Sequence, residues 1–116
     1  LHLHANAETT GIINKDTLAK MKPSAILINV SRGPLIRDED LLEALENNRI
    51  LSAGLDTHNH EPLGADSPFC RLDNVVLTDH TAYSTAEGVE ELKRKAAQNV
   101  IDVLSGVPPK YPVNKL

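Results

Sequence analysis

The sequence lacks the features that mark several large classes of protein. A single cysteine, Cys70, excludes an internal disulfide framework and fits a reducing compartment, so we expect a cytoplasmic protein. No apolar run approaches the roughly 20 residues that span a bilayer, and we expect no membrane partner. Lys and Arg number 12 against 16 Asp and Glu, which gives a net charge of −4. This sign argues against nucleic acid as a partner, because phosphate binding needs a basic surface.

The two ends of the sequence suggest part of a longer protein. The chain opens on Leu1-His2-Leu3-His4, where the alternation of apolar and polar residues predicts the end of a strand. Because a domain rarely opens in mid-strand, we expect a fragment whose natural N-terminal part is missing. Residues 106–116 contain three prolines and predict an extended tail.

Three short apolar runs between these ends predict strands. They cover residues 25–30, 51–56 and 74–78, and the first is typical of a parallel strand that is buried on both faces. Gly54 lies inside the second run, which indicates a place where a side chain would be in the way.

Helices are expected between and after these strands. Asn14 and Asp38 can each cap a helix, and a capping box of Ser84 and Glu87 predicts the start of a long last helix that Gly106 ends. The alternation predicts an α/β fold in which helices pack on the faces of a parallel sheet.

Polar residues follow the predicted strands, where ligands of such sheets bind. Arg32, Asp56 and His80 each come just after a strand, and we expect them to share one crevice. His80 could act as a general acid or base, and Glu61 could orient it and favour its protonated form. Arg32 offers a planar fork for a carboxylate, and Asp56 could accept hydrogen bonds from a ligand.

Together these residues could handle a 2-oxo acid, with Arg32 as its anchor and His80 as the proton donor during reduction of the carbonyl. The alternative is that Arg32 is a surface charge, Glu61 a solvated carboxylate and His80 a residue at a helix entry. Their common place at strand ends favours the functional interpretation.

The histidines raise the question of a metal site. His2 and His4 are two residues apart, as are His58 and His60, and such pairs share a face in a strand. No second cluster has a recognised metal spacing, so we expect no physiological metal. Cys70 has no base beside it in the sequence, which favours an inert thiol.

Several longer motifs occur in a fixed order. They are Ile28-Asn29-Val30-Ser31-Arg32-Gly33-Pro34-Leu35-Ile36, Ala53-Gly54-Leu55-Asp56, Glu61-Pro62, Asn74-Val75-Val76-Leu77-Thr78 and His80-Thr81-Ala82. In this order they resemble the NAD-dependent D-isomer-specific 2-hydroxyacid dehydrogenases, the family of phosphoglycerate, glycerate, formate and D-lactate dehydrogenases. The resemblance extends from Leu1 to about Asn114.

The resemblance implies a role for each matching position. Arg32 is similar to the substrate-binding catalytic arginine, His80 to the catalytic histidine and Glu61 to the carboxylate that pairs with it. The implied cofactor-binding positions are Val30, Ser31, Arg32, Asp56, His80, Thr81, Ala82 and Tyr83, with Asp56 facing the nicotinamide ring. NAD is the implied cofactor, a 2-oxo or 2-hydroxy acid the implied substrate, and a homodimer the implied assembly of the parent.

The chain departs from the family pattern near these positions. Asp79 stands where the family usually has proline, and Thr57-His58 stand where Val-Phe is frequent. The stretch 81–84 and the tail 111–114 are similar to the branch of the C-terminal-binding-protein corepressors. A nucleotide-responsive binding module with vestigial chemistry is therefore the alternative function.

A Gly-x-Gly-x-x-Gly turn, which holds a dinucleotide pyrophosphate, does not occur in the chain. In the family it lies upstream. The resemblance thus assigns residues 1–105 to the C-terminal half of a Rossmann-type NAD-binding domain, and 106–116 to a tail that leads back to the missing substrate domain. We expect the isolated chain to be inactive. A third interpretation is a piece of a fold that pairs with a second copy through its open sheet edge.

Overall fold

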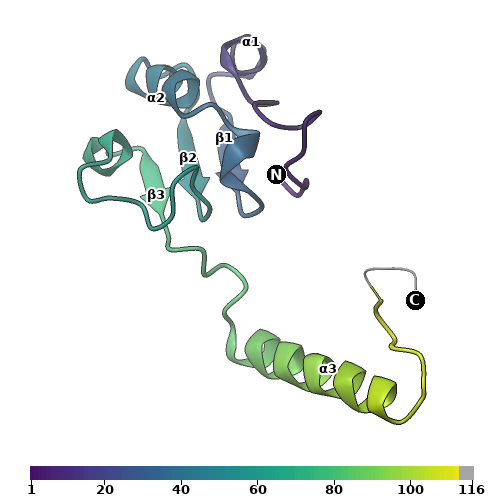
Figure 1. The fold of residues 1–116 in the computed structure, drawn as a ribbon. Coiled ribbons are helices and arrows are strands. Elements are labelled where there is room, and N and C mark those ends of the chain that lie inside the picture. The colour runs from purple at the N-terminus through teal and green to yellow at the C-terminus, as the bar shows by residue number, and fades with distance from the viewer. Residues whose placement is uncertain (113–116) are drawn as a thin grey trace. The chain divides into compact units, whose positions relative to one another are not determined.

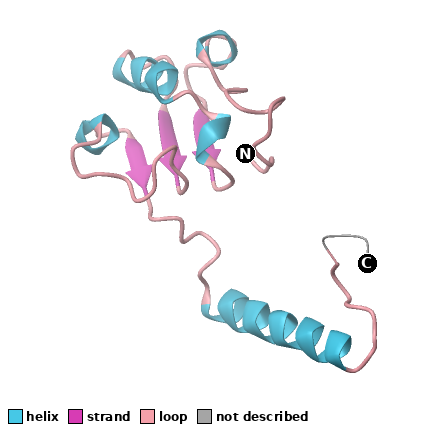
Figure 2. Cartoon of the chain, in the orientation of Figure 1, coloured by secondary structure: helices cyan, strands magenta, loops and turns pink. Residues whose placement is uncertain are grey.

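The computed structural model describes residues 1–112, and these form two compact units, of which the first is Leu1–Ala82 and the second begins at Tyr83. The first unit contains a parallel sheet in the order β1-β2-β3 (Figures 1 and 2). The strands are β1 (Ile26–Asn29), β2 (Ser52–Leu55) and β3 (Val75–Leu77). The predicted α/β fold with a parallel sheet is confirmed, while the predicted grouping of residues 1–105 stays a prediction.

Short helices connect the strands of the first unit, and one long helix belongs to the second. Their bounds are α1 (Lys15–Leu18), the 3-10 helix η1 (Gly33–Leu35), α2 (Asp38–Glu46), the 3-10 helix η2 (Pro68–Arg71) and α3 (Ala86–Leu104). Among the described residues, no helix has the length and apolarity that a membrane crossing requires.

The helix caps confirm part of the sequence prediction. The Asn14 side chain accepts hydrogen bonds from the first turn of α1, as expected. The prediction for α2 is wrong, because its N-cap is Arg37 and Asp38 is its first helical residue, where a carboxylate interacts favourably with the helix dipole. The predicted box of Ser84 and Glu87 is also wrong, because the chain stays extended for one more residue.

Helix α3 begins instead after Thr85, whose hydroxyl accepts a hydrogen bond from the Gly88 amide at 3.0 Å. It ends at Leu104, and Gly106 follows with a φ of +72°, so the predicted glycine stop is confirmed.

The core lies on one face of the sheet. Leu27 of β1 and Leu55 of β2 are buried with apolar residues of α1, α2 and η2. Ile26 and Ile28 point to the other face and are 58% and 53% exposed. The prediction that this strand is buried on both faces is therefore wrong, because alternate residues of a strand face opposite ways and the helices of the first unit cover one side.

The first residues do not form the predicted strand. The amino group of Leu1 donates to the Ile28 carbonyl at 2.6 Å, and the Leu3 carbonyl accepts a hydrogen bond from the Ser31 hydroxyl. The segment thus lies beside β1 but does not pair with it as a strand, because the bond to the Leu3 carbonyl comes from a side chain and not from the backbone.

Candidate active site

The turn after β1 is held by Asn29, the last residue of that strand. Its side chain is fully buried, with the Oδ1 atom accepting from the Ser31 amide at 3.2 Å and the Nδ2 atom donating to the Arg32 carbonyl at 2.9 Å. The Asn29 carbonyl also accepts from the Asp56 amide at 2.9 Å. One buried amide side chain therefore fixes the turn that presents Arg32 beside the end of β2.

Gly33 allows this turn to touch the loop that follows β2. A Cβ atom at this position would lie 2.1 Å from the carbonyl carbon and 2.1 Å from the carbonyl oxygen of His58. Both are backbone atoms, which cannot swing away as a side chain can. Only glycine fits here, which explains why it follows Arg32.

Asp56 holds the turn after β3 through hydrogen bonds to its carboxylate. Asp56 is 4% exposed, and its carboxylate accepts from the Thr78 hydroxyl at 2.6 Å, the Thr81 amide at 2.8 Å and the Ala82 amide at 3.0 Å. Burial acts to raise the pKa of Asp56, but the hydrogen bonds from Thr78, Ala82 and Thr81 outweigh it and lower this pKa from its ordinary value. The residue is thus a carboxylate at neutral pH.

The backbone of His80 takes an uncommon conformation on this anchor. Its φ is +51°, in the left-handed region that costs a residue with a side chain about 1 kcal/mol or more. The His80 amide donates to the Asp56 carbonyl at 2.8 Å, and the next two amides bind the Asp56 carboxylate. These bonds hold the strained turn and so fix the place of the imidazole.

His80 and Glu61 form the predicted pair. The His80 Nδ1 atom lies 2.9 Å from Glu61 Oε2, and their side chains are 42% and 38% exposed. The His58 amide donates to Glu61 Oε1 at 3.0 Å. That backbone bond, and then the bond from His80, lower the pKa of Glu61.

The charge on Glu61 decides which nitrogen of the His80 ring carries hydrogen. An ionised carboxylate can only accept, so the Nδ1 atom of His80 carries hydrogen. The Nε2 atom is then the position at which the ring gains or gives up a proton. This is the protonation pattern of a general acid–base histidine.

A hollow of about 340 Å³ lies at the carboxyl ends of the strands. It contains four predicted cofactor-binding residues: Val30, Asp56, Thr81 and Ala82. Its remaining walls come from strand residues that include Ile28, Gly54 and Val76. The hollow therefore combines apolar walls with a few polar groups, as small-ligand sites do.

The other predicted residues lie outside these contacts. The exposed Arg32 guanidinium donates to the Ser31 carbonyl at 2.7 Å and has no bond to the His80–Glu61 pair. Tyr83 is exposed and begins the second unit. The described part of the chain shows no cluster of three or more metal-ligating side chains. The last four residues of the predicted tail, 113–116, lie outside the described residues.

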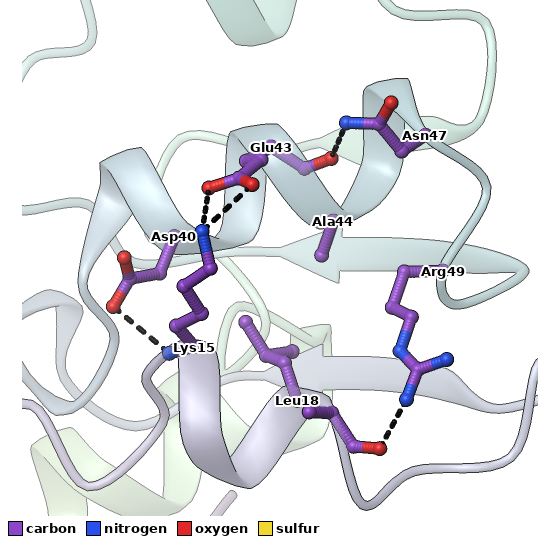
Figure 3. A pocket seen from close by; sticks show the side chains of 8 residues that line it. Lys15, Leu18, Asp40, Glu43, Ala44, Asn47 and Arg49 are labelled. Carbon is purple, nitrogen blue, oxygen red and sulfur yellow. Dashed lines mark hydrogen bonds and ion pairs between the residues drawn. The ribbon is translucent and has the colours of Figure 1, made fainter.

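A second hollow, between α1 and α2, contains none of the predicted residues (Figure 3). The Lys15 ammonium there lies 2.9 Å from both carboxylate oxygens of Glu43, and the Lys15 amide donates to Asp40 at 2.9 Å. These polar groups are hydrogen-bonded to one another and link α1 to α2.

Two supporting residues were not identified as such from sequence. The sequence pattern places both residues in motifs, with Thr78 at the end of a predicted strand, and assigns neither a supporting role. Asn29 is the one polar residue within the apolar run 25–30, and a buried polar residue needs hydrogen-bond partners, which is the signal that could have found it. Thr78 carries no comparable signal, because its partner, Asp56, is distant in sequence.

Asp56→Asn should reduce stability in a pH-dependent way. It replaces one accepting oxygen by a donor, so we expect the free energy of unfolding at neutral pH to fall by about 1–3 kcal/mol. Because the folded pKa of Asp56 is lowered, its stabilisation is present above the ordinary value of 3.8 and is lost as the pH falls through the folded value. Denaturant titrations of both chains from neutral pH to about pH 2 should therefore converge. A constant difference would contradict this role.

The fold and these contacts together define a class of protein. A parallel sheet whose strand-end turns carry an arginine, a buried aspartate and a histidine–carboxylate pair is a Rossmann-type domain with groups for proton transfer. Residues 1–82 match the family described as D-isomer specific 2-hydroxyacid dehydrogenase, NAD binding domain. The chain belongs to this family, which confirms the resemblance drawn from its motifs.

Individual relatives agree with this assignment. The chain is 42% identical to a glyoxylate reductase of Thermofilum pendens, over 99% of this chain and 34% of that protein. It is 43% identical to a D-3-phosphoglycerate dehydrogenase of Synechocystis, over 98% of this chain and 20% of that one. The chain thus spans about a third or less of the length of these curated relatives.

A solved structure confirms the fold. The crystal structure of D-lactate dehydrogenase with NAD+ from Lactobacillus jensenii superposes with a TM-score of 0.89 at 32% identity, over 99% of this chain and 38% of that one. The comparisons give no support to the corepressor-like alternative.

Proposed function

We propose that this chain provides the proton-transfer and substrate-anchoring part of an NAD-dependent oxidoreductase that interconverts 2-oxo acids and D-2-hydroxy acids. The observation that carries the proposal is the contact of 2.9 Å between His80 and Glu61. Next to His80 in the sequence, Thr81 and Ala82 line a hollow that contains half of the expected cofactor positions. Relatives that act as glyoxylate and hydroxypyruvate reductases support a small 2-oxo acid as the substrate.

The hollow fits one end of a nicotinamide dinucleotide. Its apolar walls suit the flat face of a nicotinamide ring, and Gly54 leaves its floor without a side chain. Val30, Ser31, Asp56, Thr81 and Ala82 would hold this end of the cofactor, with Tyr83 following in sequence. When bound, the cofactor supplies or receives the hydride.

The residues of the chain perform the remaining steps. The Arg32 guanidinium binds the substrate carboxylate through two parallel hydrogen bonds. In the reducing direction, His80 donates the proton from its Nε2 atom to the carbonyl oxygen while that carbon gains the hydride. Glu61 stabilises the imidazolium through Nδ1 until the proton has left, and the product is a 2-hydroxy acid.

The proposal extends to the setting of the protein. We infer a cytoplasmic protein, because the single cysteine fits a reducing compartment. We also infer that the parent is a homodimer, as the family resemblance implies. Small 2-oxo or 2-hydroxy acids would be its partners, without nucleic acid or membrane.

The function is tested by NADH absorbance with glyoxylate, hydroxypyruvate, pyruvate and longer 2-oxo acids. The assay is run on the 116-residue chain and on the longest polypeptide that its gene encodes. We expect turnover in a polypeptide that also has a glycine-rich phosphate-binding turn, and none in the 116-residue chain, which has no such turn. NADH binding by the longer polypeptide without turnover on any of these acids would contradict the proposal.

A further inference from the structure

His58 uses its side chain to hold the segment that leads into His80. The Nε2 atom of the half-buried His58 ring lies 2.9 Å from the Thr78 carbonyl oxygen. A carbonyl oxygen can only accept, so the ring carries hydrogen on Nε2. Thr78 is the first residue after β3, and its carbonyl lies beyond the last pairing of β2 with β3.

This contact completes the restraint of Thr78. The Thr78 amide donates to the Leu55 carbonyl at 3.0 Å, and its hydroxyl donates to Asp56 at 2.6 Å. The His58 ring binds the third polar group, the carbonyl. The three partners of Thr78 belong to β2 or to the residues that follow it closely. The start of the turn that bears His80 is therefore fixed to the end of one strand.

The backbone of His58 reaches the other two parts of the site. Its amide donates to Glu61 at 3.0 Å, and its carbonyl group lies where a side chain at position 33 would have to go. His58 is therefore in contact with the turn that bears Arg32, with Glu61 and with the segment before His80. Among these contacts, only the one to Thr78 depends on the identity of the side chain.

We propose that His58 is a positioning residue, whose ring fastens the Thr78 carbonyl and thereby holds the turn that presents His80 to Glu61 and to the substrate. The part of this inference that concerns catalysis rests on the proposed dehydrogenase function. The restraint itself is a property of the described chain. Because the His58 ring bonds to the Thr78 carbonyl, and the turn that bears Arg32 meets the His58 backbone at Gly33, the ring should affect proton transfer and leave the anchoring of substrate unchanged.

The first test needs no substitution. Nitrogen-15 NMR of the imidazole rings in the wild-type chain should show His58 protonated on Nε2 at neutral pH, with a scalar coupling across the hydrogen bond to the Thr78 carbonyl. A ring protonated on Nδ1 alone would overturn the proposal, because it has no donor for that carbonyl.

The second test compares His58→Phe with His58→Gln. Phenylalanine keeps a flat ring and loses the donor, while the glutamine Nε2 atom can reach the same carbonyl. The amides of residues 80–82 should exchange hydrogen about 3- to 10-fold faster in His58→Phe, since one hydrogen bond is lost, and at the wild-type rate in His58→Gln. His60→Phe is the matched control, because His60 is exposed and two residues away.

Exchange that is unchanged in His58→Phe, or equally fast in both His58 variants, would overturn the proposal. In a polypeptide with turnover, His58→Phe should lower kcat by about 3- to 10-fold with KM almost unchanged, and His58→Gln should restore it. An equal effect on kcat and KM would also overturn it. If the wild type transfers no hydride to any 2-oxo acid, the proposed function fails, whereas the exchange rates still decide the role of His58.

Discussion

Replacing His80 with asparagine should lower kcat for 2-oxo acid reduction by about 100- to 10,000-fold, the usual contribution of a positioned general acid. Asparagine tests the chemistry with little change to the structure. It tolerates a positive φ better than most residues with a side chain, so the turn at +51° should persist. Its amide nitrogen can replace Nδ1 as a donor to Glu61. What it lacks is a group equivalent to Nε2 that can carry a proton.

The measurement is NADH oxidation by the longest polypeptide of the gene, wild type and His80→Asn, with NADH affinity determined in parallel. Because His80 is also an implied cofactor-binding position, the NADH affinity separates a loss of proton transfer, which lowers kcat at saturating NADH, from a loss of cofactor binding. His60→Asn is the matched control, since His60 has the same side chain in the neighbouring loop, and it should retain wild-type kcat. A loss of less than tenfold in His80→Asn would show that another group supplies the proton.

Gly33→Ala should destabilise the fold by about 3 kcal/mol or prevent folding, because the new methyl group has nowhere to go. It would lie 2.1 Å from two backbone atoms of His58. Relief requires the turn after β1 to move away from the loop after β2, which would separate Arg32 from the His80–Glu61 pair. Stability and the geometry of the site should therefore fail together.

Gly54→Ala is the matched control for this substitution. A Cβ atom there would meet only side-chain atoms of Ile28, at 3.8 and 4.0 Å, which is ordinary contact. We expect its free energy of unfolding to stay within about 1 kcal/mol of the wild type, measured by chemical denaturation of both variants. Equal destabilisation by Gly33→Ala and Gly54→Ala would show that the close approach of the His58 backbone is not the reason why position 33 requires glycine.

The sequence predicted the elements whose signals are local. Strand ends followed from apolar runs, and the positions of Asp56 and His80 after them followed from the order of the motifs. The Glu61–His80 contact was predicted because both residues lie after neighbouring strands, and it is confirmed at 2.9 Å. The contact is observed, while the catalytic and cofactor-binding roles of all the predicted site residues stay predictions.

The features that were missed depend on contacts between distant segments. The apolar run of β1 gives no sign of which face the helices cover, so the pattern predicts a buried Ile28 that the structure shows exposed. Serine and threonine can both cap a helix, so residue type does not show whether Ser84 or Thr85 caps α3. The choice depends on the backbone conformation, which is extended at Thr85. The role of Thr78 needed the fold itself, because its partners come from a different strand.

Gly54 shows how a ligand can restrict a position that the fold leaves free. Within the chain, the neighbours of Gly54 leave room for a methyl group. The same position forms the floor of the hollow beside Asp56 and Thr81, where any added atom takes volume from whatever binds there. Variants of this strand selected for folding alone should therefore accept a wider range of residues at position 54 than variants selected for cofactor use. The difference between these two selections would identify the ligand as the cause of the restriction at this glycine.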